Sequence, residues 1–327
     1  MFKLNKTLIA AGIALLSTGI LYGCSEPQVL DFKYKGDKSI TREYEVKSED
    51  KATSEIDGNT EKQQMTITLG ITEEITDITD KNERKISYRI KNAKIARVED
   101  NKMQETPLPN LNDQVFNFKY DERGKLLETN GTEVDPNSRD AQGNPFVPSI
   151  QFDTKPIKVG ESWESKIESK NAINPITTET TNVKTTYTFA GYVKEKTNKY
   201  AKIDEKTQSE VKVVMDPKAM KSEDGKQVQN PPKITRTVSG TTEGYVLFDV
   251  KKGFIAKVEK TSKLTSVTSL VSNENDKKSE KDSKDASKTM KGTIESKLTI
   301  DLVDNTAKAA ETPNTENKDS AKETEKK

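Results

Sequence analysis

The stretch "MTITLGI", residues 65–71, alternates aliphatic residues with threonine and glycine. Successive side chains of a β-strand point to opposite faces, so this spacing places Ile67, Leu69 and Ile71 on one face. Threonine and isoleucine also fit well on a pleated surface. The stretch therefore predicts a strand with one buried face and one face toward water.

The same alternation recurs along the chain, at residues 86–90, 116–120, 211–213 and 294–302. No sustained helical spacing of apolar residues competes with it after the first residues. Only 31% of the residues are hydrophobic and 33% are charged, which favours a thin core. We expect a mainly β fold, either a large twisted antiparallel sheet or an open half-barrel. A two-sheet sandwich fits about as well.

Two segments, "FKYDERGKLLE" at 118–128 and "FDVKKGFIAKVE" at 248–259, each indicate a strand, a charged turn and a second strand. Their turns contain Gly124 and Gly253, which is typical of β-hairpins. A long pair of strand patterns precedes each hairpin, so the chain is expected to contain two related β units. The predicted organisation is a signal peptide at 1–23, β units at 24–150 and 151–303, a solvated loop at 273–291 and a disordered polar tail at 304–327.

The first residues carry Lys3 and Lys6 without an acid, followed by an uncharged apolar run, as in a secretory signal peptide. The run ends at Leu21-Tyr22-Gly23-Cys24, which contains the only cysteine and resembles the lipobox of bacterial lipoproteins. The resemblance implies cleavage between Gly23 and Cys24. It also implies a diacylglyceryl group on the Cys24 sulfur and an acyl group on the new amino terminus. Two or three such chains hold a protein firmly to a membrane. The alternative is an ordinary signal peptide or anchor helix with an unrelated cysteine.

The expected partners follow from the predicted membrane anchor and from the net charge of the chain. Removal of Lys3 and Lys6 from the 54 basic residues leaves 52, one fewer than the 53 acidic residues. No surplus of basic residues would therefore attract nucleic acid. The lipobox resemblance implies export and anchoring, on the periplasmic side of an outer membrane or on the cell surface of a single-membrane bacterium. Ser25 after the cysteine favours the outer membrane by resemblance to enteric sorting rules. We expect a membrane, a lipid or an envelope protein as partner.

The segment "PIKVGESWE", residues 156–164, resembles a Pro-x-x-Val-Gly-Glu-x-Trp element of a β-rich lipoprotein family of unknown function. The resemblance implies that a second β half opens here, and it brings no known activity. Trp163, the only tryptophan, either forms a wall of a ligand groove or anchors the core at the junction of the two units.

The absence of histidine excludes Ser-His-Asp and Cys-His catalysis and histidine metal sites. Assigning Cys24 to the anchor removes thiol chemistry as well. Asp135, Asn137 and Asp140 resemble a calcium loop only faintly, because the EF-hand spacing and its closing glutamate are missing. We therefore expect a protein that is not an enzyme and that holds no cofactor or metal.

Two hypotheses remain for the function. In the first, the sheet is curved and binds a lipid or another apolar ligand; in the second, the protein is structural or interacts with envelope proteins through a closed β core and binds no small ligand. Five aromatic residues distinguish them, because they line either an accessible groove or a closed core: Phe116, Phe118, Trp163, Phe189 and Phe248.

Overall fold

The computed structural model describes residues 28–38, 40–56, 59–99, 102–134, 150–216, 233–271 and 287–303. This part of the chain consists of β-strands and their connections, without a helix. Consequently no described segment is a helix long and apolar enough to cross a membrane. The predicted signal peptide, Cys24, the calcium-like loop and the polar tail lie outside the described residues.

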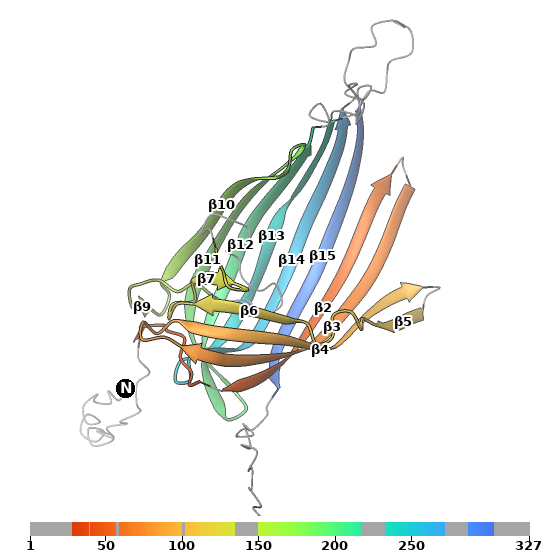
Figure 1. The fold of residues 1–327 in the computed structure, drawn as a ribbon. Helices are drawn as coiled ribbons and strands as arrows, with labels where there is room; N and C mark the ends of the chain where they lie inside the picture. Colours follow the sequence, from red (N-terminus) through yellow and green to blue (C-terminus); the bar gives the residue numbers. More distant parts are fainter. Residues whose placement is uncertain are drawn as a thin grey trace, which may run out of the picture.

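The main sheet contains 13 strands, and every pair of neighbours is antiparallel (Figure 1). Its order begins with β10 (Ser162–Asn174), β11 (Thr177–Glu195), β12 (Asn198–Met215), β13 (Lys233–Asp249), β14 (Phe254–Val271) and β15 (Ser287–Val303). It continues with β2 (Thr41–Ile56), β3 (Asn59–Ile78), β4 (Arg84–Glu99), β6 (Val115–Tyr120), β7 (Leu126–Thr129) and β8 (Thr132–Glu133), while β5 (Lys102–Pro107) pairs with β4. The end strands β8 and β10 do not pair with each other in the described structure, so the sheet is open. The prediction of a mainly β fold with a large antiparallel sheet is confirmed.

One predicted boundary needs correction. Strand β15 begins at Ser287, so the last residues of the loop predicted at 273–291 belong to a strand. They pair with the end of β14, where Val271 lies opposite Ser287. The lysine-rich composition is compatible with a strand there because Lys291 points to the exposed face while Met290 points to the other.

Both predicted hairpins are present. Strands β6 and β7 flank Gly124, and β13 and β14 flank Gly253; their φ angles are +86° and +67°. Positive φ is accessible to glycine without the steric cost that a Cβ atom brings, which explains glycine in both turns. The two turns belong to distant strands of the sheet, yet both contact the same segment of chain. The backbone N–H of Tyr34 donates to the carbonyl of Glu122 at 2.8 Å, and that of Lys35 donates to Gly253 at 3.0 Å.

This segment is part of a plug, which we define as residues 28–37 and 150–158. Within the plug, β1 (Val29–Leu30) and β9 (Ile157–Lys158) form a separate two-stranded sheet. The plug contributes Phe32, which is fully buried among aromatic rings of the plug and of the main sheet. Its ring centroid lies 5.1 Å from those of Phe152 and Phe189, 6.0 Å from Phe248 and 6.2 Å from Trp163.

The main sheet curls around this aromatic core. Phe189 of β11 and Phe248 of β13 share one buried cluster with Tyr88 of β4 and Phe118 of β6, although these strands are far apart in the sheet order. One face of the sheet is therefore concave, and we call it the inner face. Figure 1 shows the long strands β10–β15, β2 and β3 extending well beyond the curled end. The core thus fills only one end of the sheet.

Candidate functional site

The five aromatic residues singled out in the sequence lie at the plug end. Phe118, Trp163, Phe189 and Phe248 are buried in the core, and Phe116 is half-buried against it. The indole N–H of Trp163 donates to the Gln151 carbonyl of the plug at 2.9 Å. These four buried side chains do not line an accessible concavity, because the plug and the curled sheet cover them. The lipidation and cleavage residues, Cys24 and Gly23, fall outside the described residues.

Beyond the core, the first row of inner-face residues carries an ion pair. Lys260 Nζ of β14 lies 2.7 Å from Glu205 Oε1 of β12, and both side chains are largely buried. The two residues are separated by Gly244 of β13, which has no side chain to block the contact. The second oxygen of Glu205, Oε2, is buried without a hydrogen-bond partner in the described part of the chain. It is a buried acceptor, closed to a ligand lying on the surface of the sheet.

The next row is made of hydroxyl groups. The strand registers place these residues side by side on the inner face of β10 to β15: Ser165, Thr185, Thr207, Thr242, Ser262 and Ser296. Two pairs are hydrogen-bonded, Thr185 to Thr207 at 2.9 Å and Thr242 to Ser262 at 2.8 Å. We call these six residues the hydroxyl row. It offers both donors and acceptors along one line across the sheet.

Further from the plug, the inner face carries aliphatic side chains among polar ones, which include Glu179, Thr181, Ser209 and Ser266. The strand alternation places half-buried side chains there, which we call the aliphatic set: Ile167, Val183, Val211, Val213, Val238, Leu264 and Ile294. Their neighbours along the same strands point to the outer face and are exposed: Lys166, Lys184, Lys212, Lys263 and Glu295. The single-layered part of the sheet is therefore amphipathic, with its aliphatic groups on the inner face beside polar ones and most of its charges on the outer face.

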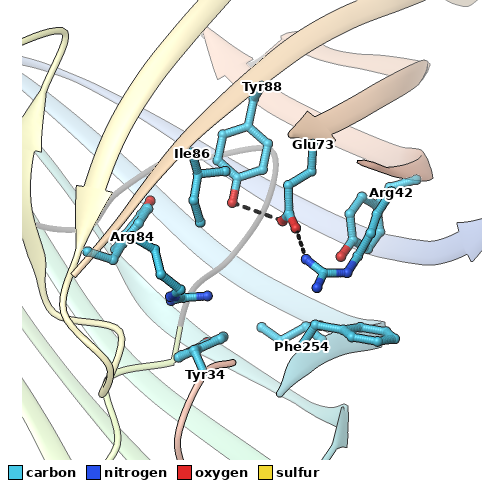
Figure 2. A pocket seen from close by; sticks show the side chains of 10 residues that line it. Tyr34, Arg42, Glu73, Arg84, Ile86, Tyr88 and Phe254 are labelled. Atoms are coloured by element: carbon cyan, nitrogen blue, oxygen red, sulfur yellow. Dashed lines mark hydrogen bonds and ion pairs between the residues drawn. The ribbon is translucent and has the colours of Figure 1, made fainter. Parts of the chain in front are cut away.

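A second feature is a cavity of about 30 Å³ between the plug and strands β2, β3, β4, β6 and β14 (Figure 2). The Arg42 guanidinium is hydrogen-bonded to Glu73, and the Tyr88 hydroxyl donates to the other oxygen of that carboxylate at 3.2 Å. Arg84 lies with its guanidinium carbon 4.4 Å from the centre of the Tyr34 ring. All of these side chains are buried.

Burial controls the charge states around the cavity. Desolvation raises the pKa of Tyr44 and Tyr88 well above the ordinary tyrosine value, and it also raises the pKa of Tyr34. These phenols are therefore neutral at physiological pH. Desolvation lowers the pKa of Arg84, but an arginine side chain starts so high that it remains protonated.

None of these charged residues was singled out from the sequence, because charged residues of a strand ordinarily lie on the face toward water. A signal was present in the alternation itself. Arg84 is in phase with Ile86 and Tyr88, and Arg42 is in phase with Tyr44. The phase of each residue would have placed both arginines on the buried face.

No protein-family model matches the chain, and no curated protein is similar enough to it to be a relative. Among the described residues, no group of three or more His, Cys, Asp or Glu side chains is arranged to hold a metal ion. The sheet itself is therefore the remaining guide to the function.

Proposed function

We propose that the chain is an exported, non-enzymatic lipoprotein, anchored to a bacterial envelope membrane through acyl groups on Cys24, and that its inner sheet face holds a membrane lipid. The observation that supports lipid binding is the amphipathic character of the sheet beyond the core. Leu264 faces inward and half-buried while Lys263 beside it is exposed, and this contrast recurs on neighbouring strands. Aliphatic side chains gathered on one face of an open sheet indicate a binding surface.

The arrangement of the inner face favours an amphiphile over a purely apolar ligand. The aliphatic set can contact acyl chains through burial of apolar surface. The adjoining hydroxyl row can exchange hydrogen bonds with a polar headgroup. A membrane lipid combines these two chemistries in one molecule.

The short distance between the predicted anchor and the plug supports the same lipid-holding role. Gln28, the first described residue, lies four positions after Cys24, and a stretch of this length spans at most ~14 Å when extended. An anchor at Cys24 would therefore hold the plug end close to the membrane. Strand β13, with 17 residues, is ~55 Å long and leads away from the plug. The open inner face would then lie away from the bilayer, where it could shield a lipid from water.

Binding of a fluorescent acyl probe to the mature chain from Ser25 onward, without detergent, tests the ligand. Leu264→Glu places a carboxylate on the inner face, and Thr265→Glu places the same carboxylate on the outer face of the same strand. We expect the first variant to weaken binding at least tenfold, since a carboxylate resists transfer next to acyl chains, and the second to bind like the wild type. Absence of binding by the wild type, or equal binding by both variants, would instead favour a structural or protein-interaction lipoprotein without a small ligand.

The anchor is tested separately by the mass of the amino-terminal peptide of the chain produced in a bacterium. We expect cleavage before Cys24 and the added mass of acyl groups on that residue. In the Cys24→Ala variant both should be lost. An unmodified Cys24 within a processed or unprocessed chain would refute the lipoprotein assignment and leave the ligand question open.

A further inference from the structure

The cavity at the plug holds more positive than negative charge. Arg42 and Arg84 contribute two cations, and Glu73 is the one carboxylate among the described residues that line it. Arg42 uses this carboxylate directly, through a buried ion pair. Arg84 is only 5% exposed, and no described carboxylate forms such an ion pair with it. A buried charge without a counter-charge is strongly unfavourable, so the balance of charge is incomplete.

The groups around Arg84 do not complete the balance themselves. Its closest described partner is the neutral ring of Tyr34, and its Nε–H has no acceptor in the part of the chain that the structure describes. The raised pKa values of the surrounding tyrosines keep them from ionising to phenolates. Figure 2 shows the Arg84 guanidinium facing across the cavity toward Glu73 and Arg42. No described residue supplies the missing charge.

Donors for an anion are already present at the cavity. Arg84 can offer its unpaired Nε–H. The Tyr34 hydroxyl accepts the N–H of Ile150 at 2.8 Å, which leaves its own proton available to donate. The Tyr44 hydroxyl belongs to another side chain that lines the cavity. Guanidinium and hydroxyl donors converging in a site of low dielectric constant suit an anion.

The volume selects the kind of anion. A cavity of about 30 Å³ suits a small anion better than an organic one. We propose that this cavity is a binding site for one small monovalent anion of the size of chloride, held by Arg84 and tyrosine hydroxyls. Because the plug, β2–β4 and β14 meet at this point, the anion would stabilise the closure of the plug end. This inference does not depend on the proposed lipid ligand.

Unfolding of the mature chain by urea in chloride and in gluconate, at constant ionic strength, tests the proposal. Gluconate is too large for the cavity. We expect chloride to stabilise the wild type, with the folding equilibrium constant rising about tenfold for each tenfold rise in chloride above the dissociation constant, as one-site binding requires. Bromide should replace chloride and give a single anomalous scattering peak beside Arg84 in crystals.

Three variants make the test specific. Arg84→Met removes the guanidinium and should abolish the chloride dependence, whereas Arg89→Met removes an exposed arginine of the same strand and should leave it intact. Tyr44→Phe deletes one hydroxyl and should weaken the dependence even if Arg84→Met fails to fold. Equal stability of the wild type in chloride and gluconate would overturn the proposal. A chloride dependence that survives in Arg84→Met would also overturn it. The same holds if Tyr44→Phe leaves the chloride dependence unchanged and no bromide is found in the cavity.

Discussion

Gly253 tests whether the plug is held by the hairpin turns that contact it. The residue has φ +67°, and a Cβ built on it would lie 2.2 Å from the backbone nitrogen of Lys35 and 2.8 Å from its Cα. These are backbone atoms of the plug, so they cannot move aside like the end of a flexible side chain. Gly253→Ala must therefore displace the plug or distort the turn. Either change weakens the hydrogen bond from Lys35 to Gly253.

The expected cost has two parts. A non-glycine residue in the left-handed region loses ~1–2 kcal/mol. Forcing an extra methyl group into a packed site costs a further ~1–3 kcal/mol. Gly131 separates the two, because it also has a positive φ, +81°, but a Cβ there would have no atom within 4 Å. Gly131→Ala should therefore lose only the first part, and Gly253→Ala should be less stable than it by ~1–3 kcal/mol.

Urea unfolding followed by tryptophan fluorescence measures this difference directly. Trp163 is the only tryptophan, and it lies at the plug end, with its ring centroid 5.4 Å from that of Tyr187 and 6.2 Å from that of Phe152. The comparison uses midpoints at unchanged slope, so that a change in stability is not confused with a change in the denatured state. Equal destabilisation by the two substitutions would refute the packing of the plug against this turn.

Three further outcomes are expected. Phe32→Ala should destabilise the fold by ~3–5 kcal/mol in urea unfolding, and Phe116→Ala by clearly less, since the first side chain is fully buried and the second is half-buried. Burial raises the pKa of Tyr88, so its stabilising contribution is present below the unfolded value of about 10 and is lost as the pH rises further. The part of the tyrosinate absorbance that Tyr88→Phe removes should therefore appear only together with the loss of circular dichroism, and its appearance in the folded protein would contradict this. The hydrogen bond from Lys119 lowers the pKa of Glu83, so the protein should lose stability as the pH falls below about 4.5 and that carboxylate is protonated. The loss should be smaller in Lys119→Met. Melting temperatures between about pH 3 and 6 measure it, and an equal loss in the wild type and in Lys119→Met would show that the pair contributes nothing.

The alternation of residues located the strands but not their lateral neighbours. Leu69 and Ile71 are buried in β3, as the stretch 65–71 predicted, because strand periodicity is a local property. The hydroxyl row could not be predicted, since it exists only when the registers of successive strands are known. A shift by one residue would turn Thr207 to the other face. Register depends on contacts between distant segments, which one sequence does not reveal.

The plug was missed for a related reason. Residues 28–37 contain only short apolar alternation, around Phe32 and Tyr34, and they read like the start of an ordinary strand. Their burial depends on two turns that lie more than eighty residues further along the chain, at Glu122 and Gly253. The five aromatic residues singled out from the sequence lie in the core or against it. The sequence left open whether they line a groove or a core, because the plug that covers them could not be predicted.

The most direct test of the proposed lipid-holding role is native mass spectrometry of the mature chain from Ser25 to Lys327, purified without detergent. We predict a species heavier than the chain by the mass of one lipid, lost on extraction with organic solvent, restored by lipid vesicles, and missing from Leu264→Glu but not from Thr265→Glu. A mass equal to that of the chain alone, unchanged after incubation with the vesicles, would contradict lipid binding on the inner face.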